Sequence, residues 1–274
     1  MGCTVAGVEI VPEGADPDKA SVARIYDAML GGVHNFAIDR EALAAFTAID
    51  PQVRSLARAN RAFLGRAVRF LVDAGVRQFL DLGSGIPTQG NVHEVAQAAA
   101  PDARVVYVDN DPVAVAHSAS LLADTPGAGI VNGDIRQPKE VLASPRLREL
   151  IDFDQPVAVL MITILHFITE EEGPEDLVAA YRDALPAGSW LALTHATDDD
   201  RPDTAAAVGK LYRSKATAPV TARSRGRIQG LFDGFDLVAP GLVHVPLWRP
   251  GAPEEVPANP HEYWVYAGVG RRAD

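Results

Sequence analysis

"FLDLGSGIP", residues 79–87, is an apolar strand that carries an acid near its end and runs directly into a glycine-spaced turn. Gly83 and Gly85 indicate a place where something approaches the backbone too closely for a side chain. Asp81 indicates that this something carries positive charge. The stretch therefore predicts a ligand site at the carboxyl end of a buried strand.

Short apolar runs alternate with helical segments throughout the chain after Gly75. The apolar runs predict strands over residues 77–82, 103–109, 129–134, 156–163 and 189–196. The segments between and after them predict helices over residues 91–100, 112–123, 138–150, 173–185 and 203–214. Such alternation is typical of right-handed crossovers and of an α/β fold whose parallel sheet is covered on both faces.

The two ends of the chain depart from this alternation. Helical periodicity fills the first part, over residues 21–30, 38–49 and 51–74. We therefore expect a helical cap over residues 1–75 and an α/β core over residues 76–274, which can also pack as a single compact domain. At the other end, residues 235–248 and 261–270 leave no room for a covering helix, so they predict an antiparallel pair at one edge of the sheet.

Charge and composition narrow the function classes. The 36 acidic residues exceed the 25 basic ones, which gives a formal net charge of −11 at pH 7. Because this field repels phosphodiester backbones, we expect no nucleic-acid partner. No apolar run approaches the length of a membrane span, so we expect no membrane association either. A single cysteine, Cys3, fits a reducing compartment and predicts a cytoplasmic protein.

Arginines recur at spacings of three to five along the third helical segment. They are Arg54, Arg58, Arg61, Arg66 and Arg69. The spacing predicts the solvated side of a long helix, with contact to a ligand as the second interpretation.

A nicotinamide dinucleotide site is the first alternative for the glycine turn. Thr88 stands where the third glycine of the dinucleotide fingerprint belongs. Asp81 would also oppose a pyrophosphate at short range. A ligand that presents an ammonium and a sulfonium has no such conflict, so the residues disfavour an oxidoreductase.

Acids also end the next two predicted strands. Asp109 can accept hydrogen bonds from both hydroxyls of a ribose, whereas Asp111 is better placed to cap the following helix. Asp134 can accept a hydrogen bond from an adenine amino group while Ile135 packs on the ring, although "GD" by itself is an ordinary turn. With Asp81, Gly83 and Gly85 at the first of them, these three successive strand ends together favour a nucleoside site.

These motifs resemble the class I S-adenosylmethionine-dependent methyltransferases, with "FLDLGSGIP", "VVYVDNDP" and "NGDIR" as the first three motifs. The sequence is most similar to a bacterial S-adenosyl methyltransferase family of largely unknown function, through "ARIYDAMLGGVHNFAIDRE", "ILHFI" and "FDGFDLVAPGLVHVPLWRP". The resemblance runs from about residue 21 to residue 266. It implies S-adenosyl-L-methionine as cofactor and a Rossmann-like, seven-stranded sheet with an antiparallel last strand.

The resemblance also implies roles for individual residues. The turn made by Gly83, Ser84 and Gly85 would approach the methionine part of the cofactor. Asp109 and Asn110 would bind the ribose. The adenine would lie against Asp134 and Ile135.

Two histidines are candidate bases for an acceptor that must lose a proton. His166 follows the fourth predicted strand, on the side where this fold places the acceptor, and its imidazole titrates near neutral pH. A histidine hydrogen-bonded in a half-buried turn is the alternative. His195, at the end of the fifth predicted strand, is a weaker candidate on the same reasoning.

The resemblance places the segment after the "GG" at 31–32 over the pocket mouth. We expect His34 and Asn35 beside cofactor or acceptor, and Phe36 closing the pocket. Tyr26 would line the pocket from the preceding helix. Packing between helices is the alternative for both aromatic residues.

The motifs exclude some methyl acceptors more firmly than they select one. No "DPPY" or "NPPY" follows the fourth predicted strand, and Cys3 is misplaced as a nucleophile, which disfavours methylation of DNA bases. "ITILHFI" has no carboxylates for a catalytic metal, so we expect no metal. We predict a methyltransferase acting on oxygen or nitrogen of a small molecule; the alternative is an inactive protein that binds the cofactor as a sensor or partner subunit.

Overall fold

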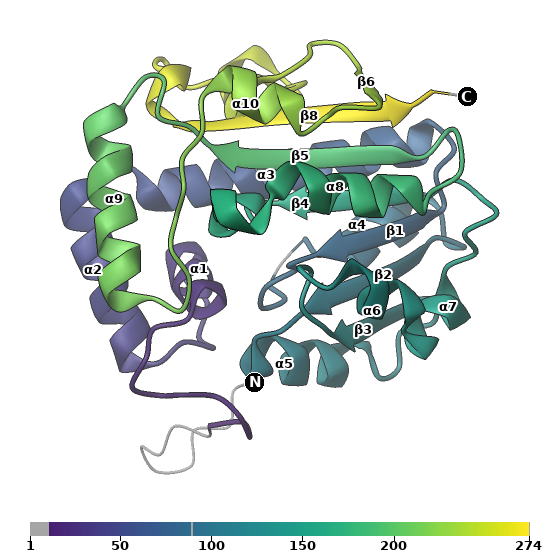
Figure 1. Cartoon of the computed structure of the whole chain (residues 1–274), viewed down its shortest axis with the longest axis horizontal. Helices are drawn as coiled ribbons and strands as arrows, with labels where there is room; N and C mark the ends of the chain where they lie inside the picture. Colours follow the sequence, from purple (N-terminus) through teal and green to yellow (C-terminus); the bar gives the residue numbers. More distant parts are fainter. Residues whose placement is uncertain (1–10, 89, 274) are drawn as a thin grey trace.

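A computed structural model describes residues 11–88 and 90–273; Cys3 lies outside them. Among these residues one mixed sheet forms the centre, in the order β3-β2-β1-β4-β5-β8-β6, with β7 pairing on β8 (Figure 1). The strands are β1 (Gln78–Leu82), β2 (Arg104–Asp109), β3 (Ala128–Asn132), β4 (Ala158–Ile162), β5 (Trp190–Ala196), β6 (Phe235–Leu237), β7 (Val243–His244) and β8 (Val265–Arg272).

The strand directions confirm the predicted fold class. Strands β1 to β5 run parallel to their neighbours, and β8 runs antiparallel to β5, to β6 and to β7. The sheet has eight strands instead of the seven predicted. The difference arises in residues 235–248, where Pro240 and Gly241, the latter with φ of +84°, separate two short strands.

Helices cover both faces of the sheet, as the alternating pattern predicted. They are α1 (Val22–Leu30), α2 (Ala37–Ile49), α3 (Val53–Asp73), α4 (Val92–Ala99), α5 (Pro112–Leu122), α6 (Pro138–Ala143), α7 (Pro145–Leu150), α8 (Pro174–Asp183), α9 (Pro202–Lys215) and α10 (Arg225–Gly230). Single 3₁₀ turns are η1 (Leu165–Phe167), η2 (Glu170–Glu172), η3 (Val245–Leu247), η4 (Pro253–Glu255) and η5 (Pro260–Glu262). None of the helices in the described part combines the length and apolarity that a membrane span requires.

The helix predicted over residues 138–150 is interrupted. Ser144 has ψ of 128°, which ends α6, and Pro145 begins α7. A residue before proline is disfavoured in the helical region, so the break has a local cause.

Alternate side chains of the central strand β1 belong to two different cores. Phe79 packs in a cluster with Phe63 of α3, and Leu80 packs in a cluster with Leu177 of α8 on the opposite face. Helix α3 therefore shares its core with the sheet. Figure 1 shows α1, α2 and α9 beside the carboxyl ends of the parallel strands. These helices and strand ends enclose the space in which a ligand can bind.

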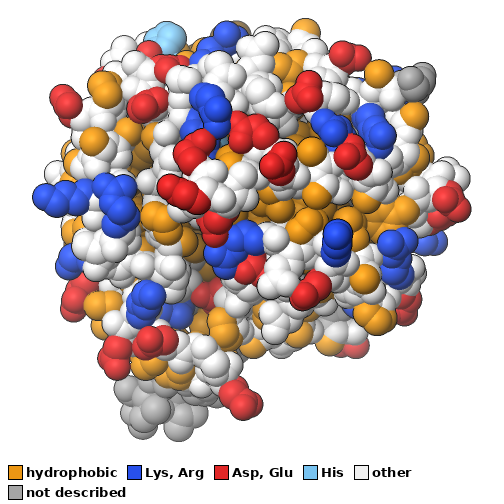
Figure 2. Space-filling model, viewed as in Figure 1, with side chains coloured by type: hydrophobic (Ala, Val, Ile, Leu, Met, Phe, Trp, Pro, Cys, Tyr) orange, Lys and Arg blue, Asp and Glu red, His pale blue; other side chains and the backbone are white. Residues whose placement is uncertain are grey.

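The face seen in Figure 2 carries interspersed acidic and basic side chains. Neither sign gathers there into one continuous stripe.

Candidate functional site

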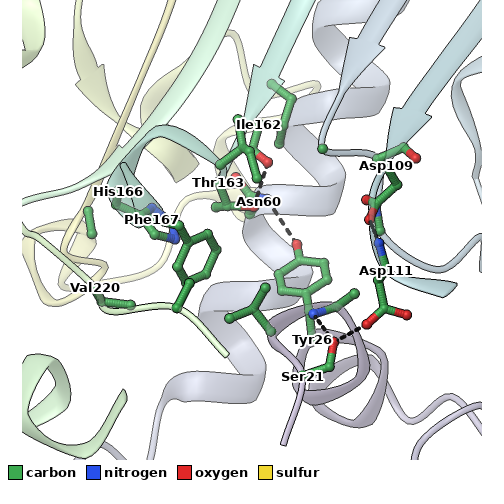
Figure 3. A pocket seen from close by; sticks show the side chains of 18 of the residues that line it. Ser21, Tyr26, Asn60, Asp109, Asp111, Ile162, Thr163, His166, Phe167 and Val220 are labelled. Carbon is green, nitrogen blue, oxygen red and sulfur yellow. Dashed lines mark hydrogen bonds between the residues drawn. The ribbon is translucent and has the colours of Figure 1, made fainter. Parts of the chain in front are cut away.

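A cavity of about 390 Å³ lies at the carboxyl ends of the parallel strands. Its size falls in the range of small-molecule sites. Figure 3 shows Asp109 and Asp111 on one side, His166, Phe167 and Val220 on the other, and Tyr26, Asn60 and Thr163 between them. Most of the predicted site residues line this cavity: Tyr26, Asp81, Gly83, Ser84, Gly85, Asp109, Asn110, Asp134, Ile135 and His166.

The glycine turn is left-handed at both glycines, but for different reasons. A Cβ on Gly83, whose φ is +72°, would lie 2.4 Å from Cδ1 of Ile164. The close approach predicted at Gly83 is therefore made by a neighbouring side chain. Gly85 has φ of +66°, and its Cβ would meet only open space. Its backbone N–H donates to Oδ2 of Asp109 at 2.7 Å.

Asp81 is a buried carboxyl that the described residues leave without a hydrogen-bond donor. Its exposed fraction is 5%, and it lines the cavity. Burial raises its pKa to about 7, and the Asp109 carboxylate adds to the rise, whereas Arg61 opposes it. A cation in the cavity would stabilise the ionised form, as the sequence predicts for an ammonium.

Two further unpartnered groups lie beside Asp81. Arg61 donates to Oγ1 of Thr88 at 2.8 Å, but its buried Nε has no partner among the described residues. Neither has the buried hydroxyl of Ser84. Both residues line the cavity. A carboxylate next to an ammonium would satisfy these donors, so this end of the cavity suits a zwitterion.

The arginine run on α3 is only partly solvated. Arg54, Arg58 and Arg69 are exposed, whereas Arg61 and Arg66 are half-buried. Arg66 donates to the backbone oxygens of Trp248 and Val245 at 2.8 and 3.0 Å. The helix face that lines the cavity comprises Val53, Leu56, Ala57, Asn60, Arg61 and Leu64. Asn60 and Arg61 lie on the same helix face as this apolar stripe, and that shared spacing is the signal that could have marked them as lining residues.

Asp111 caps the helix that follows β2, as predicted, while Asp109 lies at the end of that strand. The Asp111 carboxylate caps α5 by accepting from the N–H groups of Val113 and Ala114 at 2.8 and 3.1 Å, which confirms that prediction. Its other oxygen accepts from the hydroxyl of Ser21, which joins α1 to the cavity. Asp109 ends β2 with an exposed fraction of 7%, and burial raises its pKa to about 6. The ribose role of Asp109 stays a prediction.

The end of β3 places Asp134 and Ile135 on the cavity wall. The Asp134 carboxylate accepts from Nε of Arg136 at 2.9 Å, and Arg136 also donates to Glu172 at 3.0 Å. This guanidinium lowers the pKa of Asp134. Binding of adenine by Asp134 would therefore require Arg136 to share the carboxylate. Ile135 is 6% exposed and accepts from Tyr181 through its backbone oxygen at 3.0 Å.

A polar cluster that the sequence analysis missed lies in the middle of the cavity. Asn60 donates to the Tyr26 hydroxyl at 2.9 Å and to Oγ1 of Thr163 at 3.4 Å. Its Oδ1 is buried and has no partner among the described residues. Thr163 follows β4 with φ of +53°, a conformation that non-glycine residues rarely adopt. The cluster thus offers an unused hydrogen-bond acceptor on α3, beside the residue that follows β4.

His166 lies in η1 on the far side of the cavity, with an exposed fraction of 7%. Its Nδ1 is buried without a partner among the described residues. Burial lowers its pKa well below the usual range, and His195 and Arg223 add to this. The imidazole is therefore neutral at physiological pH, which leaves it able to accept a proton but makes it a weak base.

Four predicted site residues are not among those that line the cavity: His34, Asn35, Phe36 and His195. His195 is fully buried, and its nitrogens contact the Ala196 oxygen and the Arg223 guanidinium, both at 2.7 Å. Burial lowers its pKa to about 3. With both nitrogens engaged away from the cavity, this geometry supports a structural role and not that of a base.

The segment after the "GG" break folds back on its own helix. Asn35 donates to Oδ2 of Asp27 at 2.7 Å, and the backbone N–H of His34 donates to the same oxygen at 3.0 Å. The His34 ring contacts His117. Phe36 is buried with Ala23, Ile86, Val113 and Ala114. Its ring packs between helices. Tyr26 of α1 lines the cavity, whereas Phe36 is not among the lining residues.

The sheet order with its antiparallel last strands is that of the class I methyltransferase fold. The family model described as S-adenosyl methyltransferase matches residues 9–273, and the chain belongs to this family. Use of S-adenosyl-L-methionine follows from membership at the level of the family. Among curated proteins, no match was found.

Solved structures agree with the family assignment. A "putative methyltransferase" from Thermobifida fusca YX is 40% identical, with a TM-score of 0.90, over 96% of this chain and 98% of that one. A DUF574 family protein from Streptomyces avermitilis MA-4680 is 38% identical, with a TM-score of 0.90, over 94% and 99%. Human N-acetylserotonin methyltransferase, solved with SAM, shares the fold at 14% identity and a TM-score of 0.51, over 91% and 62%.

Proposed function

We propose that this protein binds S-adenosyl-L-methionine in the cavity at the ends of β1 to β4 and transfers its methyl group to oxygen or nitrogen of a small molecule. The observation that carries this proposal is Asp81, a buried carboxyl to which no side chain or backbone group of the described residues donates, next to the unpartnered Nε of Arg61 and hydroxyl of Ser84. Buried polar groups are normally satisfied. Their arrangement fits the amino and carboxylate groups of a methionine part.

The remaining strand ends fit the rest of the cofactor. Asp109 stands at the end of β2, where a ribose would reach it, and Ile135 offers an apolar surface at the end of β3. A pyrophosphate would fit this cavity poorly, because the carboxylates of Asp81 and Asp109 would repel it. The same arrangement would serve an inactive sensor, from which only turnover distinguishes the enzyme.

Methyl transfer requires few chemical steps from the protein itself, because the cofactor carries the activated group. When bound, S-adenosyl-L-methionine supplies a methyl carbon already activated by its sulfonium. The acceptor forms a bond to that carbon as the carbon–sulfur bond breaks, which leaves the thioether S-adenosylhomocysteine and releases the acceptor proton. The cavity would orient the acceptor beside the methyl group, and His166, neutral at physiological pH, can take the proton.

Calorimetric titration tests the proposal. The wild-type protein should bind S-adenosylmethionine and S-adenosylhomocysteine with micromolar affinity and should not bind NAD. Asp109→Ala removes a carboxylate at the ribose position, and losing hydrogen bonds to a charged group should weaken both ligands by about ten- to a hundred-fold. Binding of NAD alone, or unchanged affinity in Asp109→Ala, would contradict the proposed site.

A further inference from the structure

The cavity extends beyond the part in which we propose that the nucleoside binds. The acids at the ends of β1, β2 and β3 account for one half of its wall. Across β4 and β5, the wall continues to the start of β8, where Trp264 and Val265 line it. We define the acceptor chamber as this second half, walled by Phe46, Phe167, Val208, Tyr212, Val220 and Trp264.

The acceptor chamber differs from the nucleoside half in charge. The charged lining residues are Arg61, Asp81, Asp109, Asp111, Asp134 and Arg136. Arg61 donates to Thr88, and the others lie at the ends of β1, β2 and β3 or just after them. The described residues that wall the acceptor chamber include no charged side chain. A charged acceptor would therefore lose its hydration without gaining a counter-charge.

Aromatic rings supply much of the acceptor chamber wall. The ring of Phe46 meets that of Tyr212 edge-on at 5.7 Å between centroids, and Phe167 lies 6.0 Å from Tyr212. Trp264 is 6.5 Å from Phe46. Figure 3 shows Phe167 and Val220 across the cavity from Asp109 and Asp111. Such rings favour contact with another ring or with an apolar body.

Two buried polar atoms without a partner among the described residues belong to side chains that line the cavity. Asn60, with an exposed fraction of 2%, presents Oδ1, and His166 presents Nδ1. Both residues line the cavity, with Thr163 beside Asn60. The Asn60 oxygen can accept a hydrogen bond from a hydroxyl, and so can Nδ1 of His166 when the neutral imidazole carries its proton on Nε2. Unsatisfied acceptors in a buried wall indicate a ligand that brings its own donor.

We infer that the acceptor is an uncharged, apolar, ring-bearing molecule with a hydroxyl group, held in the acceptor chamber and hydrogen-bonded through that hydroxyl by Asn60 or His166. This inference rests on the proposed function. In the transfer, the hydroxyl oxygen bonds to the methyl carbon, the carbon–sulfur bond breaks with its electron pair staying on sulfur, and the hydroxyl proton leaves to His166 or to water. The products are a methyl ether and S-adenosylhomocysteine.

The test compares two probes that differ in one charge. The protein is first saturated with S-adenosylhomocysteine and then titrated calorimetrically with 2-naphthol or with 6-hydroxy-2-naphthoate. The naphthol should bind, and the naphthoate should bind at least about a hundred-fold more weakly because its carboxylate has no partner in the acceptor chamber. Equal or tighter binding of the naphthoate would overturn the inference, as would no naphthol binding up to about 1 mM.

A charge placed on the wall provides the matched variant. Ala218 is half-buried and lines the cavity, so Ala218→Glu should weaken naphthol binding at least about ten-fold and leave S-adenosylhomocysteine affinity unchanged. Ala123→Glu makes the same change at an exposed position outside the cavity and should alter neither. Unchanged naphthol binding in Ala218→Glu would contradict the inference. Failure of the wild-type protein to bind S-adenosylhomocysteine would instead contradict the proposed function.

Discussion

Asp81→Asn should remove most of the pH dependence of cofactor binding. Burial raises the pKa of Asp81 to about 7, so the group is largely neutral in the free protein at pH 6. An ammonium-bearing ligand binds the ionised form better. Affinity should therefore rise as pH rises through 7, until the ligand amino group itself begins to lose its proton near pH 8.

The size of the effect follows from the pKa. About a tenth of Asp81 is ionised at pH 6 and about three quarters at pH 7.5, which gives about an eight-fold gain in affinity. Asp109, whose pKa is about 6, passes from about half to almost fully ionised over the same interval and adds at most about two-fold. Asp81→Asn should retain only this smaller gain.

Calorimetric titration with S-adenosylhomocysteine between pH 6 and pH 7.5 measures these gains. Asp124→Asn is the control, because Asp124 is exposed and lies outside the cavity lining. It should keep the full pH dependence of the wild type. A flat wild-type profile, or an eight-fold gain retained by Asp81→Asn, would refute the placement of the ammonium at Asp81.

Three stability predictions follow from buried contacts. Gly83→Ala should cost about 1 to 3 kcal/mol in a denaturant titration, because φ is +72° and the new Cβ would meet Ile164; no loss would place the strain elsewhere. Asp39→Asn breaks the buried ion pair with Arg24 at 2.7 Å and should cost about 3 to 5 kcal/mol; a change below about 1 kcal/mol would show that the pair does not hold α1. His195 has a pKa lowered to about 3, so its contribution to stability is present above pH 6.5 and is lost as pH falls. The cost of His195→Asn should accordingly shrink by about 2 kcal/mol from pH 7 to pH 5 in chemical unfolding, and a constant cost would contradict a neutral, buried His195.

The periodicity of the sequence predicts most of the fold because burial imposes it. The apolar run of β1 is buried along its whole length, and the capping position of Asp111 is occupied as predicted. Deviations come from local chemistry that periodicity does not register. Ser144 before Pro145 divides one predicted helix, and α10 (Arg225–Gly230) is too short and polar to show an apolar stripe.

The site was predictable where residues follow strands and less so where they lie on helices. Asp81, Asp109 and Asp134 end adjacent parallel strands, and topology alone brings them to one edge. Asn60 and Arg61 reach the cavity only because α3 packs across the same edge, which is a tertiary contact. His195 points into a buried contact with Arg223, although it also ends a strand.

The most direct test of the central claim is a crystal structure of the protein with S-adenosylhomocysteine. The amino group of the ligand should lie at Asp81, its ribose at Asp109 and its adenine against Ile135, with the homocysteine sulfur facing the acceptor chamber. A nucleoside bound elsewhere, or bound in this cavity with its adenine at Asp81, would contradict the claim.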